Sequence, residues 1–490
     1  MGTSHSAAGG RLPTESSPVT QPLMHGTIPL TARLEPWMDS LIADPKLCQE
    51  LIKQYGSPLN LHDYSSMSRN IAELREAADE HGIDFEIYLA RKANKTLGAI
   101  DHAVAEGCGI DVASFNELDQ CLKRGVPADR IIVTAAVKSV ALLRLAVEHG
   151  VVLSLDNLDE TAELQAIVQE SGKPAAVALR LASDNPSIPP TRFGLRAGEW
   201  LTFLDQADKP ETLKVEGIHF HLNGYDGGQR AQLALEALAL IDALRDRGHD
   251  PSFVDMGGGI PMSYLDDGKQ WAGFWEALAE LPEGDESLTW KSDRLGATGP
   301  EASIALYPYH QKLIRGEWLR KVLATEETTT RRTVAQMLIE RGIQLRCEPG
   351  RSLLDGCGLT LAEVAFVKNR SDGAPLVGLH MNRTQCRSTS ADFLLDPLLI
   401  PTGPKVQDRA PYEGFLVGAY CIEEELILRR RFEFPAGVAK GDLVAFPNTG
   451  GYLMHIIESA SHQLPLAKNL VIDGVDWILD GIDTADLLVG

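Results

Sequence analysis

A single lysine, Lys92, is the first residue of this 490-residue chain whose position indicates covalent chemistry. It follows the apolar run FEIYLA at residues 85–90, with Arg91 before it and Ala93 and Asn94 after it. A lysine that lies near another cation and is partly removed from water has a lowered pKa, and its neutral amine can attack an aldehyde. Taken alone, a lysine at the end of a strand is more often a solvated side chain. The hypothesis therefore depends on what else the chain offers.

Two further motifs offer groups for an anion and for an aromatic nitrogen. Gly257, Gly258 and Gly259 follow the apolar run SFV, and bare backbone N–H groups at such a turn can bind a phosphate, although a simple turn explains three glycines equally well. The motif EPGR places Glu348 and Arg351 after the run IQLRC. An arginine matches the geometry of phosphate oxygens, and a glutamate can hold the proton of a pyridinium ring, which makes that ring an electron sink.

A histidine, His221, lies in the motif GIHFHLNG near the end of another expected strand. Its flat ring could stack on an aromatic cofactor. The competing interpretation is a core histidine whose nitrogens are satisfied by neighbouring polar groups.

The elements that must position these residues alternate between short apolar runs and amphipathic helices. The strands are expected at residues 85–90, 130–135, 151–155, 175–181, 217–222 and 252–257. Several of the helical segments between them end in glycine, as helix C-caps do. Strands that are apolar on both faces and alternate with helices predict a parallel sheet, and their number favours an α/β fold of the (β/α)8 TIM-barrel type.

Four segments are expected along the chain. Residues 1–25 form a flexible segment, residues 26–57 pack on a β domain, residues 58–346 form the cofactor-binding (β/α)8 barrel, and residues 347–490 form a C-terminal, mainly β domain whose strands are expected to be antiparallel. An insertion at about residues 261–340 carries four tryptophans and falls where active-site lids commonly lie.

The composition excludes several classes of partner. With 46 basic and 68 acidic residues the formal net charge is −22, which repels nucleic acids and anionic membranes. The seven cysteines are scattered singly, without the spacing of a zinc site, so no metal is expected and a reducing cytosol fits best. No apolar run approaches the roughly eighteen residues of a membrane-spanning helix. The protein is therefore expected to be cytoplasmic.

Six motifs occur together in an order that is far more specific than any one of them: YLARKANK, DVASFNEL, GIHFHLNG, DMGGG, EPGR and GAYCIEEEL. In this order they resemble the ornithine, diaminopimelate and arginine decarboxylases of fold type III, which depend on pyridoxal 5'-phosphate (PLP) and use an alanine-racemase-like barrel. The resemblance extends from about Tyr55 to Val471 and is interrupted by the insertion.

The resemblance implies a role for each matched residue. Lys92 is the Schiff-base lysine, His221 stacks on the pyridine ring, and Glu348 pairs with the ring nitrogen. The groups expected to bind the phosphate are Gly257, Gly258, Gly259, Arg351 and, from the motif NTGGY, Tyr452. The polar positions expected to line or brace the pocket are Asp111, Ser114, Glu117 and Arg180.

Cys421, in GAYCIEEEL, matches a cysteine that the partner subunit supplies and that protonates the carbanion after CO2 leaves, so the resemblance also implies a homodimer with shared active sites. A buried apolar thiol is the competing interpretation. Ile422 stands where the family carries an acidic residue for a distal amine, and the acidic run at residues 423–425 is expected to be a solvated face. Gly224 replaces a phosphate-binding serine, so backbone N–H groups are expected to serve there.

Three functions remain open from the sequence. The first is decarboxylation of an amino acid or of a modified or carrier-linked amino acid. The second is a PLP-dependent racemase or epimerase, in which Cys421 would be the second base. The third is a non-catalytic PLP-binding protein, but such proteins resemble a bare barrel, and the EPGR, CIEEEL and NTGGY motifs after the barrel argue against it.

Overall fold

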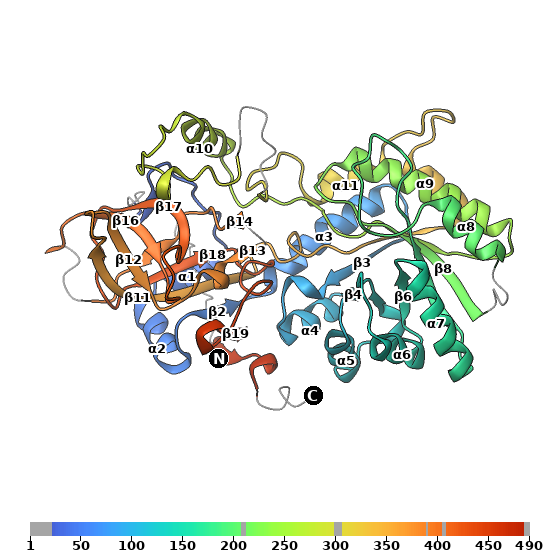
Figure 1. Ribbon diagram of the computed structural model, residues 1–490, viewed down its shortest axis with the longest axis horizontal. Helices are drawn as coiled ribbons and strands as arrows, with labels where there is room; N and C mark the ends of the chain where they lie inside the picture. The colour runs from blue at the N-terminus through green and yellow to red at the C-terminus, as the bar shows by residue number, and fades with distance from the viewer. Residues whose placement is uncertain (1–21, 207–211, 298–305, 389–390, 404–407, 485–490) are drawn as a thin grey trace, which may run out of the picture.

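The computed structural model describes residues 22–206, 212–297, 306–388, 391–403 and 408–484. They form two bodies that lie side by side, a barrel and a mainly β domain (Figure 1). The predicted fold class, a (β/α)8 barrel with a C-terminal β domain, is confirmed. None of the helices in these ranges combines the length and the apolar character that crossing a bilayer requires.

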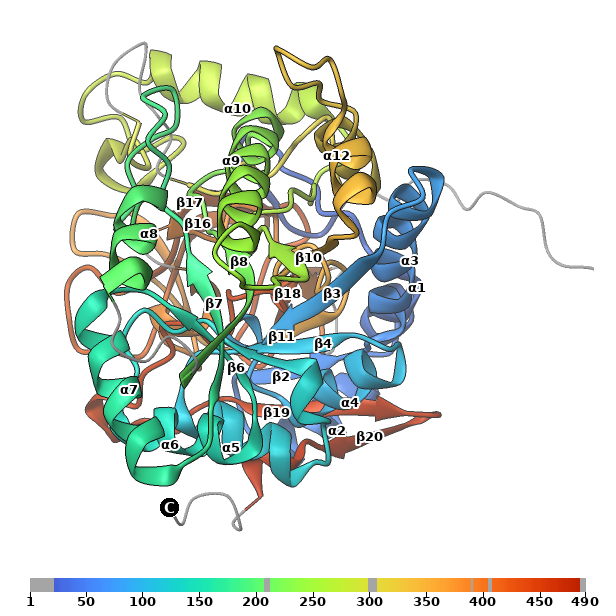
Figure 2. The same ribbon diagram turned by 90° about the vertical axis from the view of Figure 1, so that its right-hand side faces the viewer.

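The barrel is closed by parallel strands in the order β10-β3-β4-β5-β6-β7-β8-β9, which Figure 2 shows from the barrel side. The strands are β3 (Phe85–Ala90), β4 (Gly109–Val112), β5 (Ile131–Val133), β6 (Val152–Leu155), β7 (Ala175–Arg180), β8 (Leu213–His219), β9 (Phe253–Asp255) and β10 (Gln344–Cys347). Apolar residues on alternate positions form a separate cluster that fills the interior: Tyr88, Ile132, Val152, Ala178 and Phe253. The barrel is therefore a packed core, and only the ends of its strands are free to build a site.

Helices alternate with the barrel strands along the chain. They are α3 (Ser65–Glu80), α4 (Leu97–Ala105), α5 (Phe115–Lys123), α6 (Val140–His149), α7 (Leu158–Ser171), α8 (Ala197–Gln206), α9 (Gly227–Arg245), α11 (Arg315–Leu323) and α12 (Val334–Arg341). Ser139 and Asn157 cap the first turns of α6 and α7, and Gly150 and Gly172 end these helices in the left-handed conformation. For these helices the prediction of glycine C-caps is confirmed.

The β domain is built on a sheet with the order β1-β17-β16-β12-β11-β2-β19-β20, with β15 and β18 joined to it through β11. Its strands are β1 (His25–Gly26), β2 (Leu59–His62), β11 (Gly358–Asn369), β12 (Pro375–Leu379), β15 (Leu398–Ile400), β16 (Tyr412–Val417), β17 (Leu426–Phe434), β18 (Leu443–Pro447), β19 (Lys468–Asp473) and β20 (Asp476–Leu479). A short pair, β13 (Arg387–Ser388) and β14 (Ala391–Asp392), lies apart. The expectation of antiparallel strands is wrong for two pairs, since β12 pairs with β16 and β19 pairs with β2 in parallel.

The N-terminal part of the chain belongs to the β domain for longer than the sequence pattern predicts. The barrel is expected from residue 58, but β2 pairs with β11 and β19, so the first barrel element is α3. Before β2, α1 (Pro36–Ile42) and α2 (Pro45–Tyr55) pack on the same sheet. The segment expected to be flexible, residues 1–25, lies outside the described residues up to residue 21, and His25 pairs with Glu433 of β17.

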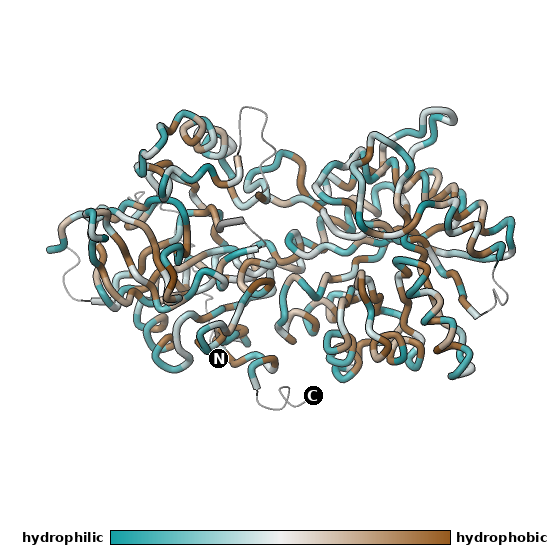
Figure 3. The backbone as a smooth tube through the Cα atoms, viewed as in Figure 1, coloured by the Kyte–Doolittle hydropathy of each residue, from teal (hydrophilic) through white to brown (hydrophobic). Residues whose placement is uncertain are grey.

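The segment expected as an insertion, at about residues 261–340, contacts both bodies. Helix α10 (Gly268–Glu280) packs on the β domain, whereas α11 packs on α3 and α9 of the barrel (Figure 1). Apolar residues concentrate on the strands of both bodies, as Figure 3 shows.

Short 3-10 turns complete the chain: η1 (Arg91–Ala93), η2 (Ala128–Arg130), η4 (Trp290–Ser292), η5 (Arg383–Cys386), η7 (Ser461–Gln463) and η8 (Gly481–Asp483).

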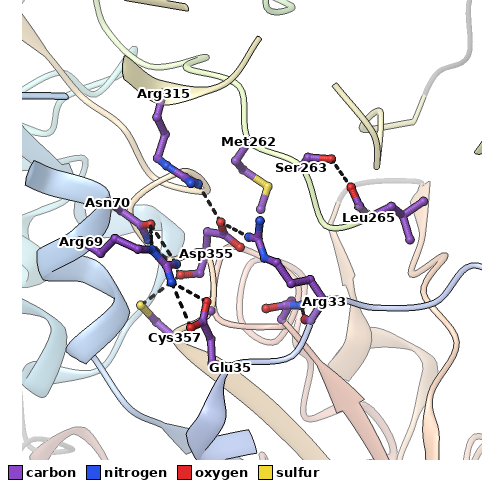
Figure 4. A network of polar contacts seen from close by, with 12 residues as sticks. Arg33, Glu35, Arg69, Asn70, Met262, Ser263, Leu265, Arg315, Asp355 and Cys357 are labelled. Atoms are coloured by element: carbon purple, nitrogen blue, oxygen red, sulfur yellow. Dashed lines mark hydrogen bonds and ion pairs between the residues drawn. The ribbon is translucent and has the colours of Figure 1, made fainter. Parts of the chain in front are cut away.

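A buried polar network joins the N-terminal arm, α3, α11 and the turn that follows the EPGR motif (Figure 4). The Asp355 carboxylate accepts hydrogen bonds from Arg33 and from Arg315, the latter at 2.7 Å. Asn70 of α3 donates to the carbonyl oxygens of Leu353 and Asp355, both at 2.9 Å. The turn after EPGR is therefore fixed by three segments that are distant in the sequence: the N-terminal arm, α3 and α11.

Candidate active site

Lys92 lies on η1, directly after β3, at the end of the barrel where the carboxyl ends of the strands meet. Its ammonium pairs with the buried Asp111 carboxylate at the end of β4, which also accepts a hydrogen bond from the Thr134 hydroxyl. The Lys92 side chain is 36% exposed, so its Nζ can be reached by a ligand. Lys92 and Asp111, which the sequence predicts for one site, lie together.

The neighbouring cation of Lys92 does not act as predicted. Arg91 turns away and donates to the carbonyl oxygens of Asn94 and Lys95 and, at 3.1 Å, to the side chain of Gln120. Burial lowers the pKa of Lys92, but the charges of Asp111 and Glu348 outweigh it and leave that pKa above its usual range. The expectation of a lowered pKa is wrong, because the nearest charged partner is a carboxylate.

The β domain forms hydrogen bonds with the loop that carries Lys92. The backbone N–H of Tyr452 donates to the Ala93 carbonyl oxygen at 2.7 Å, and the Asn94 side chain donates to the Gly450 carbonyl oxygen at 2.9 Å. The Lys95 backbone N–H donates to Nδ1 of His455 at 3.2 Å. The motifs RKANK and NTGGY are therefore held together by hydrogen bonds, although about 360 residues separate them in the sequence.

A buried group of two carboxylates and an imidazole lies at the ends of β8, β9 and β10. Ligand atoms of His219, Asp255 and Glu348 all lie within 4.8 Å of one another. His219 Nε2, Asp255 Oδ2 and Glu348 Oε1 are buried and have no hydrogen-bond partner among the described residues. Burial raises the pKa of Asp255 to about 6, and burial together with Asp111 and Asp255 raises that of Glu348 well above its usual range. The sequence pattern indicates Glu348 but not His219.

The glycine turn after β9 leaves no room for side chains. Gly257 and Gly259 have φ values of +63° and +81°, which disfavour other residues. A Cβ on Gly258 would lie 2.9 Å from the Glu348 carbonyl oxygen, and one on Gly259 would lie 2.0 Å from Nη2 of Arg230. The turn therefore brings bare backbone close to the barrel mouth, as a phosphate cradle requires.

Arg230, in the first turn of α9, is a site residue that sequence reasoning missed. Its buried guanidinium donates to the carbonyl oxygens of Leu222, Gly224 and Gly258, at 3.0, 2.7 and 3.2 Å. It thereby ties the HFHLNG loop to the glycine turn. The available signal was one charged residue among the apolar residues of the buried face of α9, and such a residue carries no motif.

His221 lies partly buried at the mouth of the barrel. Burial, with the cations Lys92 and Arg180 nearby, lowers its pKa to about 3, so the ring is neutral at physiological pH. Phe193 meets it edge-on, with ring centroids 5.7 Å apart. A cavity of about 360 Å³ adjoins it, lined by residues 189–193, 221–223 and Gln229. Its position and neutral state suit stacking on an aromatic ring.

Of the polar residues expected to line or brace the pocket, two brace it from behind and one faces away. Arg180, at the end of β7, donates to the Thr134 carbonyl oxygen at 3.2 Å and to Asp156 at 3.1 Å. Glu117 accepts a hydrogen bond from the Ala113 backbone at 2.6 Å. Ser114 is exposed, and its hydroxyl caps α5 by accepting from the Glu117 N–H at 3.2 Å. The structure therefore gives Ser114 a helix-capping contact.

Arg351 points into a group of tyrosines. Its guanidinium donates to the Tyr264 hydroxyl at 3.0 Å and to the Ser388 hydroxyl at 3.1 Å, and it lies 4.3 Å from the ring centroid of Tyr307. Among the described residues no carboxylate forms an ion pair with it, so its charge is available to an anion. Tyr264 and Tyr307 come from the segment after β9, of which the sequence analysis singled out only the tryptophans.

Cys421 lies in the β domain, on the loop between β16 and β17, and it is exposed. The interpretation of a buried apolar thiol is therefore wrong. Within the described residues no hydrogen bond or ion pair links it to the Lys92 site of the same chain. The acidic run after it is not wholly a solvated face, because Glu425 is buried and accepts from the Arg383 N–H at 2.8 Å.

Comparison with known proteins identifies what this arrangement belongs to. The family model of the pyridoxal-binding domain of pyridoxal-dependent decarboxylases matches residues 66–285. An uncharacterized protein of Sinorhizobium fredii is 29% identical over 86% of this chain and 89% of its own length. The diaminopimelate decarboxylase of Zymomonas mobilis is 26% identical over 87% of this chain and 90% of that enzyme. The structure of Helicobacter pylori diaminopimelate decarboxylase with L-lysine aligns with a TM-score of 0.65 at 20% identity, over 90% of this chain and 98% of that chain.

The barrel is thus a pyridoxal-binding domain of the decarboxylase class. The family model and the diaminopimelate decarboxylase relatives confirm the resemblance to the fold-type III PLP-dependent decarboxylases, which are lyases, and with it the cofactor indicated by the motifs. The site fits that cofactor on its own geometry. Glu348 Oε1 is a buried acceptor without a partner among the described residues, as a ring-nitrogen proton requires, and the turn at residues 257–259 excludes any Cβ.

Proposed function

We propose that this enzyme decarboxylates an amino acid or amino-acid derivative at a site shared between two subunits. The observation that carries the proposal is the convergence of Lys92, Asp111 and Glu348 at the carboxyl ends of the barrel strands, where the charges of both carboxylates act on the lysine. A lysine amine for the Schiff base and a buried acceptor without a partner among the described residues are the two groups that PLP chemistry needs from a protein.

Each residue of the site would have a separate role toward the cofactor. When bound, PLP supplies a ring that accepts the electron pair left at Cα as the bond to the carboxylate carbon breaks. Lys92 holds the cofactor through Nζ, Glu348 holds a proton at the ring nitrogen, and neutral His221 covers one ring face. The phosphate would be bound by the backbone N–H groups of Gly258 and Gly259, because that of Gly257 donates to Asp255 at 2.9 Å. Tyr452 would also bind it, since it lies near Gly350: a Cβ there would be 2.6 Å from the tyrosine oxygen.

We propose that Arg351 serves an anion and that the substrate lacks a free distal amine. Arg351 has neutral tyrosine and serine partners and no carboxylate among the described residues, so a phosphate or a substrate carboxylate can take that place. Ile422 is 43% exposed and cannot pair with an amine. The relatives named as diaminopimelate decarboxylases suggest a dicarboxylic amino acid as the parent of the substrate.

A homodimer would complete the site, because Cys421 of one subunit would donate the proton that Cα needs after CO2 has left. Two exposed apolar surfaces support this arrangement. One is Ile422 beside Cys421, and the other is a rim at the start of α5, α6 and α7, composed of Phe115, Val137, Val140 and Leu158.

Mixing two inactive variants tests the shared site. Lys92→Ala and Cys421→Ala proteins, mixed under conditions of verified subunit exchange, should form heterodimers with one intact site of two. With random exchange and independent sites, activity should return to at most about a quarter of wild type. Full activity of Cys421→Ala alone, or no recovery after exchange, would remove Cys421 from the reaction.

A substrate panel tests the reaction itself. The holoenzyme is incubated with meso-diaminopimelate, lysine, ornithine, arginine and their N-acylated forms, while the visible absorption band, CO2 release and hydrogen exchange at Cα are followed. We expect a band shift and CO2 release with a derivative whose distal amine is blocked, and none with Lys92→Ala. Hydrogen exchange without CO2 release would instead establish a racemase or epimerase.

A further inference from the structure

We propose that Ser154 and His219 are positioning residues for Glu348: Ser154 sets which nitrogen of His219 carries the proton, and His219 then directs an ionised Glu348 toward the ring nitrogen of PLP. This inference rests on the proposed role of Glu348. Ser154 lies outside the motifs by which the family was recognised, and His219 lies within GIHFHLNG, where only His221 was given a role.

The three side chains lie in a row across the barrel interior, from β6 through β8 to the end of β10. The Ser154 hydroxyl lies 2.6 Å from Nδ1 of His219, and Nε2 of His219 lies 3.5 Å from Oε1 of Glu348. Ser154 and His219 are fully buried. The second distance exceeds a normal hydrogen bond, so an adjustment of a few tenths of an ångström is needed to form one.

The row defines which tautomer His219 adopts. A neutral imidazole has one N–H and one acceptor nitrogen. The only hydrogen-bond partner of the Ser154 hydroxyl within the described residues is Nδ1 of His219. We assign the hydroxyl as the donor, because accepting from Nδ1 would leave its own O–H buried without an acceptor. The proton of the imidazole is then on Nε2, which faces Glu348. Burial and the nearby cations Arg180 and Lys92 lower the pKa of His219 well below its usual range, so the ring keeps a single N–H.

The groups around Glu348 favour its protonated form, and the N–H of His219 acts against them. Burial, Asp111 on β4 and Asp255 on β9 all favour the protonated carboxyl, whereas Lys92 on η1 and Arg180 on β7 favour the carboxylate. The first group dominates, so Glu348 left to itself retains its proton. A hydrogen bond donated to the charged form shifts the balance toward the carboxylate. His219 therefore moves the shared proton from Glu348 to the ring nitrogen, and a protonated ring is the stronger electron sink.

The location of that proton can be measured directly with PLP labelled with ¹⁵N in its ring, because the nitrogen chemical shift separates the protonated from the unprotonated ring. In wild-type holoenzyme we expect a protonated ring nitrogen. His219→Leu should move the proton equilibrium roughly 10- to 100-fold toward Glu348, the factor that corresponds to one hydrogen bond to a charged group. His219→Gln, which retains an N–H donor, should restore much of the shift, and Ser154→Ala, which frees the tautomer, should lie between.

Controls separate this inference from the proposed function. His62→Leu and Ser66→Ala alter a buried histidine and a buried serine elsewhere and should leave the nitrogen shift unchanged. If wild type forms no covalent complex between Lys92 and PLP, the proposed function fails. If that complex forms and Ser154→Ala and His219→Leu both keep the wild-type nitrogen shift, the positioning role is refuted. Where His219→Leu fails to fold, a wild-type nitrogen shift in Ser154→Ala alone refutes it.

Discussion

Replacing Asp355 with asparagine should destabilise the chain through a network that the sequence gives no sign of. The carboxylate is fully buried and accepts hydrogen bonds from Arg33 of the N-terminal arm and from Arg315 at the start of α11 (Figure 4). Asparagine keeps the shape but removes the charge. Arg33 then loses its only described ion-pair partner, while Arg315 retains Glu73 at 2.6 Å.

The magnitude follows from the exposure of the partners. Breaking a buried ion pair by removing one partner costs about 3–5 kcal/mol, because it leaves the other charge uncompensated. The Arg315 side chain is 4% exposed but keeps a second carboxylate, and that of Arg33 is 24% exposed and can be hydrated. We therefore expect the lower end of the range, about 3 kcal/mol, which is roughly 1 M in the urea midpoint if the slope is about 3 kcal/mol per molar.

Urea unfolding followed by tryptophan fluorescence measures this change, and limited proteolysis tests its location. Because Arg33 leads into α1, the variant should become sensitive to cleavage in the N-terminal arm before the barrel is cut. Glu170→Gln is the matched control, since its ion pair with Arg144 is exposed on the surface and should leave the midpoint unchanged. An Asp355→Asn protein with the wild-type midpoint and cleavage pattern would show that the network does not support the fold.

Further predictions concern the site. Glu348→Gln should retain PLP but lose turnover roughly a hundredfold or more, measured by CO2 release, and loss of the cofactor instead would contradict the assigned role. Arg230→Met should weaken PLP affinity by roughly tenfold or more, measured by absorption titration, because it removes the three hydrogen bonds that tie the HFHLNG loop to the glycine turn, and a single charge-assisted hydrogen bond already has about a tenfold effect. Unchanged affinity would remove Arg230 from the cradle. The raised pKa of Asp255, about 6, means that ionising this buried carboxyl opposes folding, so its contribution to stability is lost as pH rises from about 4 to 6. Asp255→Asn should lack this step in the pH dependence of the urea midpoint, and an identical profile would argue against burial as its cause.

The barrel could be predicted because its signals are local. Apolar runs alternate with capped helices, and β3 occupies the predicted residues 85–90. The sequence patterns do not predict β4, although it carries Asp111. This strand has only four residues, begins with a glycine and is soon followed by α5. They also assign β2 to the wrong body, since pairing with β11 and β19 depends on residues hundreds of positions away. Short strands carry too few residues for periodicity to separate one sheet from another.

The site could be predicted only where a motif names the residue. Lys92, Glu348 and Tyr452 were found by their motifs and lie around one barrel mouth, whereas Arg230 lies outside the motifs and donates to backbone carbonyls. His219 lies within GIHFHLNG, but its partners Ser154 and Glu348 come from other strands. Such contacts impose no spacing along the chain. The expectation of a lowered pKa for Lys92 was wrong for the same reason. The residue that raises this pKa, Asp111, belongs to the next strand.

The domain arrangement explains why a bare barrel would not be equivalent to this chain. Three hydrogen bonds from the segment at residues 450–455 hold the loop that carries Lys92, and a fourth contact, the close approach of Tyr452 to Gly350, holds the EPGR turn. Without these contacts, both loops would follow their strands into solvent with nothing packed on their outer side. Loops exposed in this way are the most mobile part of a backbone. The β domain therefore contributes to the site in two ways: it fixes the lysine of its own subunit, and it carries the exposed Cys421 that we assign to the other. A substitution such as Asn94→Ala acts only on the first of these, so it should weaken PLP binding while leaving the subunit able to complement a Cys421→Ala partner.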